Sequence, residues 1–183
     1  MSLFNRLFSK DRKLFPYPLY LDTTLSRKDE EFKPLRQGYV RLYTCGPTAY
    51  DRQHIGNLFP SVIANVLRRI LSLKGYKVQE VNNITDFGHL SDDEGSEDKM
   101  TKGLKREGMP LNLQSMRALA EKYTTLFLED LPPLGVNPKD ISYPRASDYV
   151  GEQIALIKAL VQKGYAYTTK NGVYFETSKY KEY

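Results

Sequence analysis

The chain carries, at positions 43–57, the run Tyr43-Thr44-Cys45-Gly46-Pro47-Thr48-Ala49-Tyr50-Asp51-Arg52-Gln53-His54-Ile55-Gly56-Asn57. The run predicts a strand, a tight Gly-Pro turn and a short loop that opens onto a helix. It holds the only cysteine of the chain and one of its two histidines. At such a junction, free backbone N–H groups and the positive end of a helix lie beside a crevice, where nucleotide phosphates bind.

The sequence on either side of this run predicts a strand–helix–strand unit. Residues 39–45 and 76–81 alternate as strands, and apolar residues recur at helical spacing after Pro60. Pro60 suits the first turn of this helix and Gly75 a stop. The order implies a right-handed parallel βαβ unit, whose ligands bind at the carboxyl ends of the strands. Cys45 and residues 82–86 fall at those ends.

The remaining sequence predicts more peripheral elements. Residues 19–25 suit a short strand, and the charged residues 26–38 suit a loop. Residues 86–109 are polar, and their acidic cluster lacks the spacing of a calcium loop, so a solvated flexible loop is expected. The acidic residues are Asp92, Asp93, Glu94, Glu97 and Asp98.

The C-terminal third predicts two amphipathic helices, a strand and a hairpin. The helices cover 113–127 and 150–161, with a short strand at 141–143 between them. Ser147 is a plausible N-cap of the second helix, and Gly164 lies just past its end. Asn171-Gly172 between two alternating segments predicts a β-hairpin.

Composition indicates a globular protein and excludes several classes. The 183 residues are 40% hydrophobic and 27% charged, without the ~20-residue apolar run that spans a bilayer, so no membrane partner is expected. The net charge of +5 is compatible with a polyanion such as tRNA. One cysteine excludes an internal disulfide and suits a cytoplasmic location. Residues 1–15 lack the apolar core of a secretory signal and suit an N-terminal extension, with a transit peptide as the alternative.

The run at 43–57 closely resembles the active-site entry of cysteinyl-tRNA synthetases, which are class I enzymes. That family carries Cys-Gly-Pro-Thr-Val-Tyr-Asp followed by His-Ile-Gly-His; here Ala49 replaces Val and Asn57 replaces the second His. The resemblance covers residues 19–183. It resumes at Asn83-Ile84-Thr85-Asp86, Pro144-Arg145-Ala146-Ser147 and Lys163-Gly164-Tyr165-Ala166-Tyr167.

The resemblance implies an α/β fold: the Rossmann-like parallel sheet of the N-terminal part of a class I catalytic domain, with a β-hairpin that starts the connective insertion. It implies three parts. These are residues 1–38 (extension and first strand), 39–163 (first half of the catalytic domain) and 164–183 (start of the insertion).

Cys45 is the expected metal ligand. Taken alone, a single cysteine at a strand end is most often a small buried hydrophobic residue. In cysteinyl-tRNA synthetases the cysteine of this block binds Zn²⁺, which also binds the thiolate of the substrate cysteine. The family's other zinc ligands, a later Cys and a His-Ile-Glu-Cys-type segment, are not in these 183 residues, so Cys45 is one ligand of an incomplete site.

His54, Gly56 and Asn57 are the expected ATP-binding residues, with His54 and Asn57 in the catalytic role. Taken alone, a histidine before a helix caps the helix or faces water. The resemblance implies that His54 contacts the phosphates and that Gly56 lets the adenine approach the backbone. The Asn57 amide can still donate a hydrogen bond but cannot become cationic.

Gly46, Thr48 and Thr85 are the expected cysteine-binding residues. Gly46 permits close backbone approach and Thr48 offers a hydroxyl. The resemblance implies that Thr85 lies in the cysteine pocket; the alternative is an ordinary polar turn. The aromatic and basic residues after 164 could stack on RNA, but on a hairpin they more often pack on one another.

The implied function is cysteine–tRNA ligation: ATP, with Mg²⁺, activates cysteine to cysteinyl-adenylate, and tRNA(Cys) accepts the cysteine. The Lys-Met-Ser-Lys-Ser loop of the family is not present. Residues 98–102, Asp-Lys-Met-Thr-Lys, are only superficially similar to it and lie at a different place in the chain. The chain is therefore expected to be an incomplete portion or a short relative. Two alternatives stay open: an ATP-dependent cysteine:amine ligase, and a non-catalytic module that binds RNA or protein.

Overall fold

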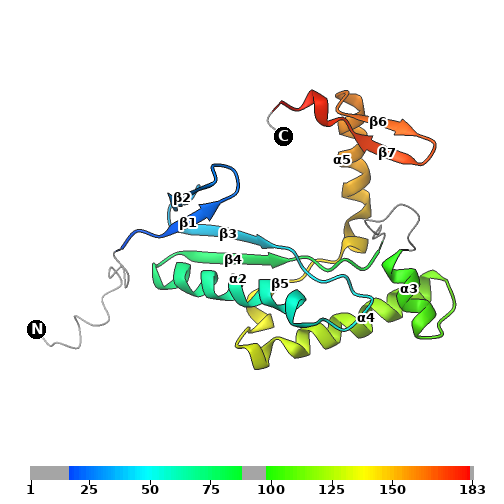
Figure 1. The fold of residues 1–183 in the computed structure, drawn as a ribbon, viewed down its shortest axis with the longest axis horizontal. Helices are drawn as coiled ribbons and strands as arrows, with labels where there is room; N and C mark the ends of the chain where they lie inside the picture. The colour runs from blue at the N-terminus through cyan, green and yellow to red at the C-terminus, as the bar shows by residue number, and fades with distance from the viewer. Residues whose placement is uncertain (1–16, 88–97, 182–183) are drawn as a thin grey trace, which may run out of the picture.

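The computed structural model describes residues 17–87 and 98–181, and it confirms the α/β fold. Its centre is a parallel sheet of β3 (Tyr39–Thr44), β4 (Lys77–Asn82) and β5 (Ile141–Ser142), in the order β3-β4-β5 (Figure 1). Thr44 pairs with Asn82, so β3 and β4 end at the same edge. The predicted βαβ unit and the placement of Cys45 and residues 82–86 at the carboxyl ends are confirmed.

Helix α2 (Ile55–Leu73) connects β3 to β4 and begins earlier than predicted. The sequence predicts Pro60 in the first turn, whereas Pro60 lies inside the helix. The cause is a capping box at His54 and Asn57, which starts the helix one turn upstream. At the other end, Gly75 has a φ of +86°, which favours glycine and ends the helix as predicted.

Two helices, α3 (Lys99–Arg106) and α4 (Leu113–Asp130), follow β4. The prediction of a polar loop over 86–109 is wrong for α3, which Asp98 caps by accepting a hydrogen bond from the Thr101 amide. The helix forms because Met100, Gly103 and Leu104 are buried among other elements. The acidic residues 92–97 lie outside the described residues.

The hydrophobic core lies between α3, α4 and the segments that follow β3 and β4. It explains why α4 has six buried residues along its length. The fully enclosed members are Ala49, Ile84, Met100, Leu104, Leu119, Ala120, Phe127, Leu131 and Val136.

Outer elements surround this centre. Strands β1 (Tyr20–Thr23) and β2 (Lys28–Glu31) form an antiparallel hairpin, so the predicted loop over 26–38 contains a strand. The residues of β2 are all charged and show no alternation of apolar and polar side chains. The strand is therefore defined by its backbone pairing with β1. Short 3-10 turns occur at Pro132–Leu134, Pro138–Asp140, Ala146–Tyr149 and Thr177–Lys179.

Helix α5 (Val150–Gln162) rises away from the sheet and carries the hairpin of β6 (Ala166–Thr169) and β7 (Gly172–Phe175) (Figure 1). The hairpin at Asn171-Gly172 is confirmed. Ser147 is not the N-cap of α5: it lies in the preceding 3-10 turn and binds Asp86. In the described residues, α5 contains no buried residue.

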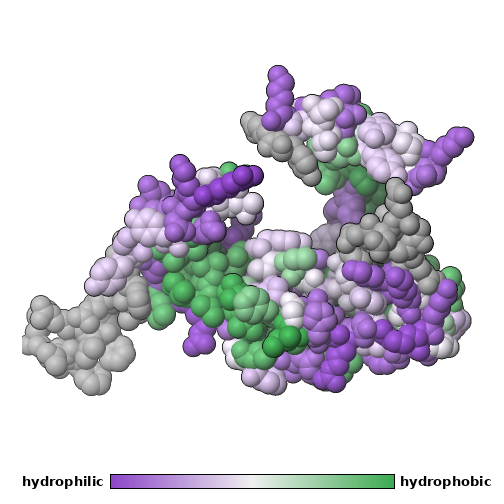
Figure 2. Space-filling model, viewed as in Figure 1, coloured by the Kyte–Doolittle hydropathy of each residue, from purple (hydrophilic) through white to green (hydrophobic). Residues whose placement is uncertain are grey.

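Apolar side chains also remain exposed on α2, and Figure 2 shows a hydrophobic surface over this helix. They recur at three- and four-residue spacing along its outer side: Ile55, Phe59, Ile63, Val66, Ile70 and Leu73. Among the described residues, none of the helices combines the length and apolar character needed to cross a membrane.

Candidate active site

The segments that leave β3 and β4 continue side by side beyond the sheet. The Ala49 amide donates to the Thr85 carbonyl at 2.9 Å, and the Thr85 amide donates to the Pro47 carbonyl at 2.9 Å. Thr48 and Thr85 therefore face each other across a parallel β-bridge. The two predicted cysteine-binding threonines are neighbours because the backbone pairing extends past the strands.

Gly46 lies directly against the segment that follows β4. A Cβ at this position would lie 1.7 Å from the Asn83 carbonyl oxygen, so only glycine fits. The Gly46 amide donates to Asn83 Oδ1 at 3.2 Å, and Asn83 Nδ2 donates to Thr85 Oγ1 at 3.3 Å. The Asn83 side chain thus links Gly46 to Thr85 and fixes the relative positions of these two residues.

His54 and Asn57 interact at the start of α2. The Gly56 amide donates to His54 Nδ1 at 3.1 Å, and the His54 amide donates to Asn57 Oδ1 at 3.4 Å. The capping interpretation of His54 is therefore confirmed. Because Nδ1 accepts a hydrogen bond, the neutral imidazole carries its proton on Nε2, which remains a donor for a ligand.

A cavity of about 420 Å³ brings most of the predicted residues together. It contains Cys45, Gly46, Thr48, His54, Gly56 and Asn57, whereas Thr85 does not line it. We call residues 45–57, which form most of its wall, the entry segment. The remaining lining residues are Pro47, Tyr50, Asp51, Arg52, Gln53, Pro60 and Lys99.

Lys99 is a cavity residue that the sequence analysis did not predict. It comes from the first turn of α3, in the stretch where the sequence predicts a polar loop. A helical pattern over 99–106 could have indicated it, but eight residues give too little periodicity to separate a helix from a polar loop. Arg52, also in the cavity wall, pairs with Asp130 of α4 at 3.0 Å.

A cluster of charged groups links α3 to α4 next to the cavity. Arg106 Nη1 donates to Asp51 Oδ2 at 2.6 Å. Tyr123 donates to Glu107 Oε1 at 2.5 Å, and Lys122 also pairs with Glu107. Hydrogen bonds from Lys122 and then Tyr123 lower the pKa of Glu107. These ionic contacts hold the end of α3 against the entry segment and α4.

A second charged cluster lies between α2 and the sheet. Arg68 Nε lies 3.3 Å from Glu80 Oε2, and Arg68 Nη1 lies 3.2 Å from Asp140 Oδ2. Burial raises the pKa of Glu80, and the attraction of Arg68 offsets this only in part. Burial, followed by the nearby Glu80, raises the pKa of Tyr143. This cluster fixes α2 on β4.

The donor set at Cys45 does not fit a complete zinc site. Its thiol is exposed and has the Gly46 carbonyl at 3.8 Å. Across residues 17–87 and 98–181, no three His, Cys, Asp or Glu side chains gather as metal ligands. A closed zinc site usually needs four such ligands. Cys45 can therefore be one soft ligand and no more.

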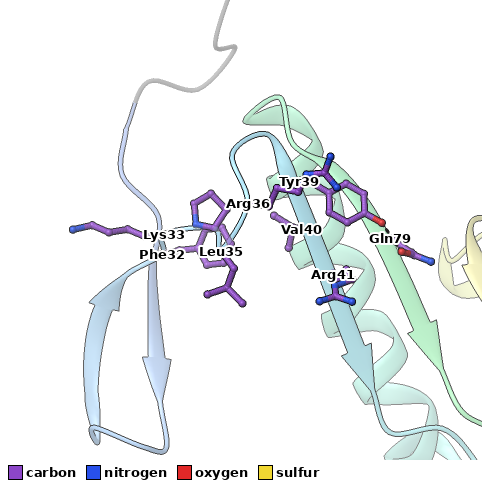
Figure 3. Close-up of a pocket in the computed structure, with 9 residues that line it drawn as sticks. Phe32, Lys33, Leu35, Arg36, Tyr39, Val40, Arg41 and Gln79 are labelled. Atoms are coloured by element: carbon purple, nitrogen blue, oxygen red, sulfur yellow. Dashed lines mark hydrogen bonds between the residues drawn. The ribbon is translucent and has the colours of Figure 1, made fainter.

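Another cavity, of about 640 Å³, lies at the opposite, amino end of β3 (Figure 3). Tyr39 donates to Gln79 across its floor, and the Arg36 guanidinium lies 5.7 Å from the Tyr39 ring centroid. Ligands of parallel sheets bind at the carboxyl ends of the strands. The cavity at the entry segment lies at the carboxyl end of β3, so we favour it over the cavity at the amino end as the functional site.

Comparison with known proteins identifies the family of the chain. Residues 31–183 match the family model for the tRNA synthetases class I (C) catalytic domain. A cysteine–tRNA ligase 1 of Burkholderia lata is 46% identical over 167 residues, which cover 91% of this chain and 34% of that protein. A cysteine–tRNA ligase of Thermococcus gammatolerans is 44% identical over 160 residues, or 87% and 30% of the two chains.

The chain thus spans about a third of the length of these relatives. Among solved structures, a chain described as an arginyl tRNA synthetase from Campylobacter jejuni aligns with a TM-score of 0.51 at 14% identity. The alignment covers 80% of this chain and 39% of that chain, and it supports the fold alone. The family match over residues 31–183 covers most of the chain, and the protein accordingly belongs to the family of class I (C) tRNA synthetase catalytic domains.

Proposed function

We propose that this chain is the portion of a cysteine–tRNA ligase that binds ATP and cysteine and forms cysteinyl-adenylate. The observation that carries the proposal is the cavity that joins Cys45, Thr48 and His54 at the carboxyl end of β3. The names of the relatives support cysteine as the amino acid and tRNA as the final acceptor. This role also supports a cytoplasmic location, where tRNA is charged.

The start of α2 suits the phosphates of ATP. His54 Nδ1 is occupied by the Gly56 amide, so Nε2 can donate to charge that develops on the α-phosphate. The oxygen of the Asn57 amide accepts from the His54 backbone, which leaves Asn57 Nδ2 as a second donor. The carboxylate of cysteine would attack the α-phosphorus and release pyrophosphate with its Mg²⁺, so the protein supplies position and charge rather than a nucleophile.

The wall formed by Gly46, Thr48 and the neighbouring Thr85 suits the amino acid. Gly46 lets the substrate approach the backbone, and the two threonines offer hydroxyl groups from adjacent segments. Zinc bound partly by Cys45 would recognise the substrate thiolate, since soft sulfur ligands prefer this metal. The other ligands would have to come from outside the described residues.

The test is cysteine-dependent exchange of pyrophosphate into ATP. The His54→Ala variant removes the donor, and the exposed Arg69→Ala on α2 serves as the matched control. We expect His54→Ala to lower the exchange rate by about 10²-fold, the usual effect of losing one such donor, and Arg69→Ala to leave it unchanged. Equal rates in the protein and His54→Ala would contradict the proposal.

A second measurement separates the proposal from its alternatives. Transfer of the activated cysteine to tRNA(Cys) supports a cysteine–tRNA ligase, whereas transfer only to a small amine indicates the cysteine:amine ligase. Salt-sensitive RNA binding that is independent of both ATP and cysteine would indicate a non-catalytic module.

A further inference from the structure

We propose that Arg106 is a positioning residue that holds the backbone of the entry segment in the conformation needed for catalysis. Its effect on catalysis rests on the proposed function, while its effect on the segment's geometry stands without it. Arg106 is on α3, more than forty residues from the entry segment in the sequence. It is not itself among the residues that line the cavity.

The Arg106 guanidinium binds two consecutive residues of the entry segment. Nη1 donates to Asp51 Oδ2 at 2.6 Å, and Nη2 donates to the Tyr50 backbone carbonyl at 2.6 Å. A planar guanidinium suits this paired arrangement, which a lysine cannot reproduce. Tyr50 and Asp51 lie between Thr48 and His54, so the contact fixes the middle of the segment.

Tyr123 of α4 contacts the Arg106 guanidinium in turn. Nη2 also donates to the Tyr123 hydroxyl at 3.0 Å, and the guanidinium carbon lies 5.5 Å from the centroid of the Tyr123 ring. Tyr123 is buried, with 6% of its surface exposed, and its hydroxyl donates to Glu107. The entry segment is thereby connected through Arg106 to the hydrophobic core.

Gly103 provides an independent observation of the same contact. A Cβ at this position would lie 2.8 Å from the Tyr50 carbonyl oxygen and 2.8 Å from Leu119 Cδ2. Helix α3 therefore lies directly against the entry segment, with no side chain between them. Gly103 and Arg106 are three residues apart, so they share one side of the helix.

We expect Arg106 to contribute to the conformation of the entry segment and little to the free energy of unfolding. Its side chain is 41% exposed and that of Asp51 is 48% exposed, and ion pairs this exposed contribute little to folding. A displacement of about 1 Å at a reacting group, by contrast, can cost about 10²-fold in rate. The same helix carries Lys99 into the cavity wall, so a shift of α3 also moves a cation there.

Hydrogen–deuterium exchange tests the geometry without reference to activity. The variants are Arg106→Ala and Arg106→Lys, with Lys102→Ala as a control because Lys102 is exposed on the same helix. We expect faster amide exchange in peptides from residues 46–57 for both Arg106 variants, with unchanged exchange in residues 166–175. Unchanged exchange in 46–57 for Arg106→Ala would overturn the proposal.

Pyrophosphate exchange tests the catalytic consequence. We expect Arg106→Ala to lower kcat by about 10- to 100-fold, Arg106→Lys to recover only part of it, and Lys102→Ala to stay within about twofold. Millimolar guanidinium ion should partly restore Arg106→Ala, whereas equal sodium chloride should not. An unchanged kcat in Arg106→Ala would overturn the catalytic role. Absence of cysteine-dependent exchange in the unmodified protein would instead contradict the proposed function, with the deuterium measurement still decisive for the geometry.

Discussion

Helices α4 and α5 carry similar amphipathic patterns but have opposite surroundings. In α4, six residues are buried, including Leu119 and Phe127, whereas within the described residues α5 has none. Five large apolar residues of α5 stay exposed, and besides Leu156 four of them recur at helical spacing: Val150, Ile154, Ile157 and Val161. A helical pattern thus shows which side of a helix is apolar, but it does not show whether another element covers that side.

The largest expected effect comes from truncating one apolar side chain in each helix. Phe127 is 1% exposed and packs edge-on against Tyr143, with ring centroids 6.0 Å apart. Phe127→Ala should lower the free energy of unfolding by about 3–5 kcal/mol, because it removes packing and leaves a cavity.

Ile157 is 41% exposed, so Ile157→Ala should cost below about 1 kcal/mol. Urea unfolding followed by circular dichroism measures both variants. A cost for Ile157→Ala as large as that for Phe127→Ala would show that the apolar side of α5 is covered in solution.

Two glycines give an intermediate contrast. A Cβ at Gly46 would meet the Asn83 carbonyl at 1.7 Å, whereas a Cβ at Gly151 of α5 would meet nothing within 4 Å. Gly46→Ala should destabilise the protein by about 1–3 kcal/mol, because the two segments must separate. Gly151→Ala should stabilise it by up to about 0.5–1 kcal/mol, through lower backbone entropy of the unfolded chain. Thermal melting of the two variants should therefore shift in opposite directions, and shifts of the same sign would refute the contrast.

The smallest expected effect is a change in pH dependence. Burial raises the pKa of Glu80 above its ordinary value of 4.5, so the folded state holds its proton to higher pH than the unfolded state. The free energy of unfolding should then fall as the pH rises from the ordinary pKa of Glu80 to its raised pKa in the folded state. Glu80→Gln should remove that fall.

Urea midpoints between the ordinary and the raised pKa of Glu80 measure the slope. Glu152→Gln on α5 is the control, because Glu152 is exposed. An unchanged slope in Glu80→Gln would show that Arg68 fully compensates the buried carboxylate.

Much of the site could be predicted from local sequence. The alternation at 39–45 and 76–81 indicated two parallel strands, and their ends placed Cys45 next to residues 82–86. Pro60 predicts a start of α2 that is too late, because the capping pair of His54 and Asn57 begins the helix upstream of it. Helix α3 was missed because a short polar helix depends on tertiary burial of Met100 and Leu104.

The βαβ order, the hairpin at Asn171-Gly172 and the resemblance that the family match confirms can all be predicted from the sequence alone. These features follow from spacing, turn chemistry and motifs, which are local properties of the chain. The position of α3 against the entry segment, which brings Lys99 and Arg106 to it, depends on tertiary packing. That contact joins residues about fifty positions apart, and it depends on close packing at Gly103 that no local periodicity records.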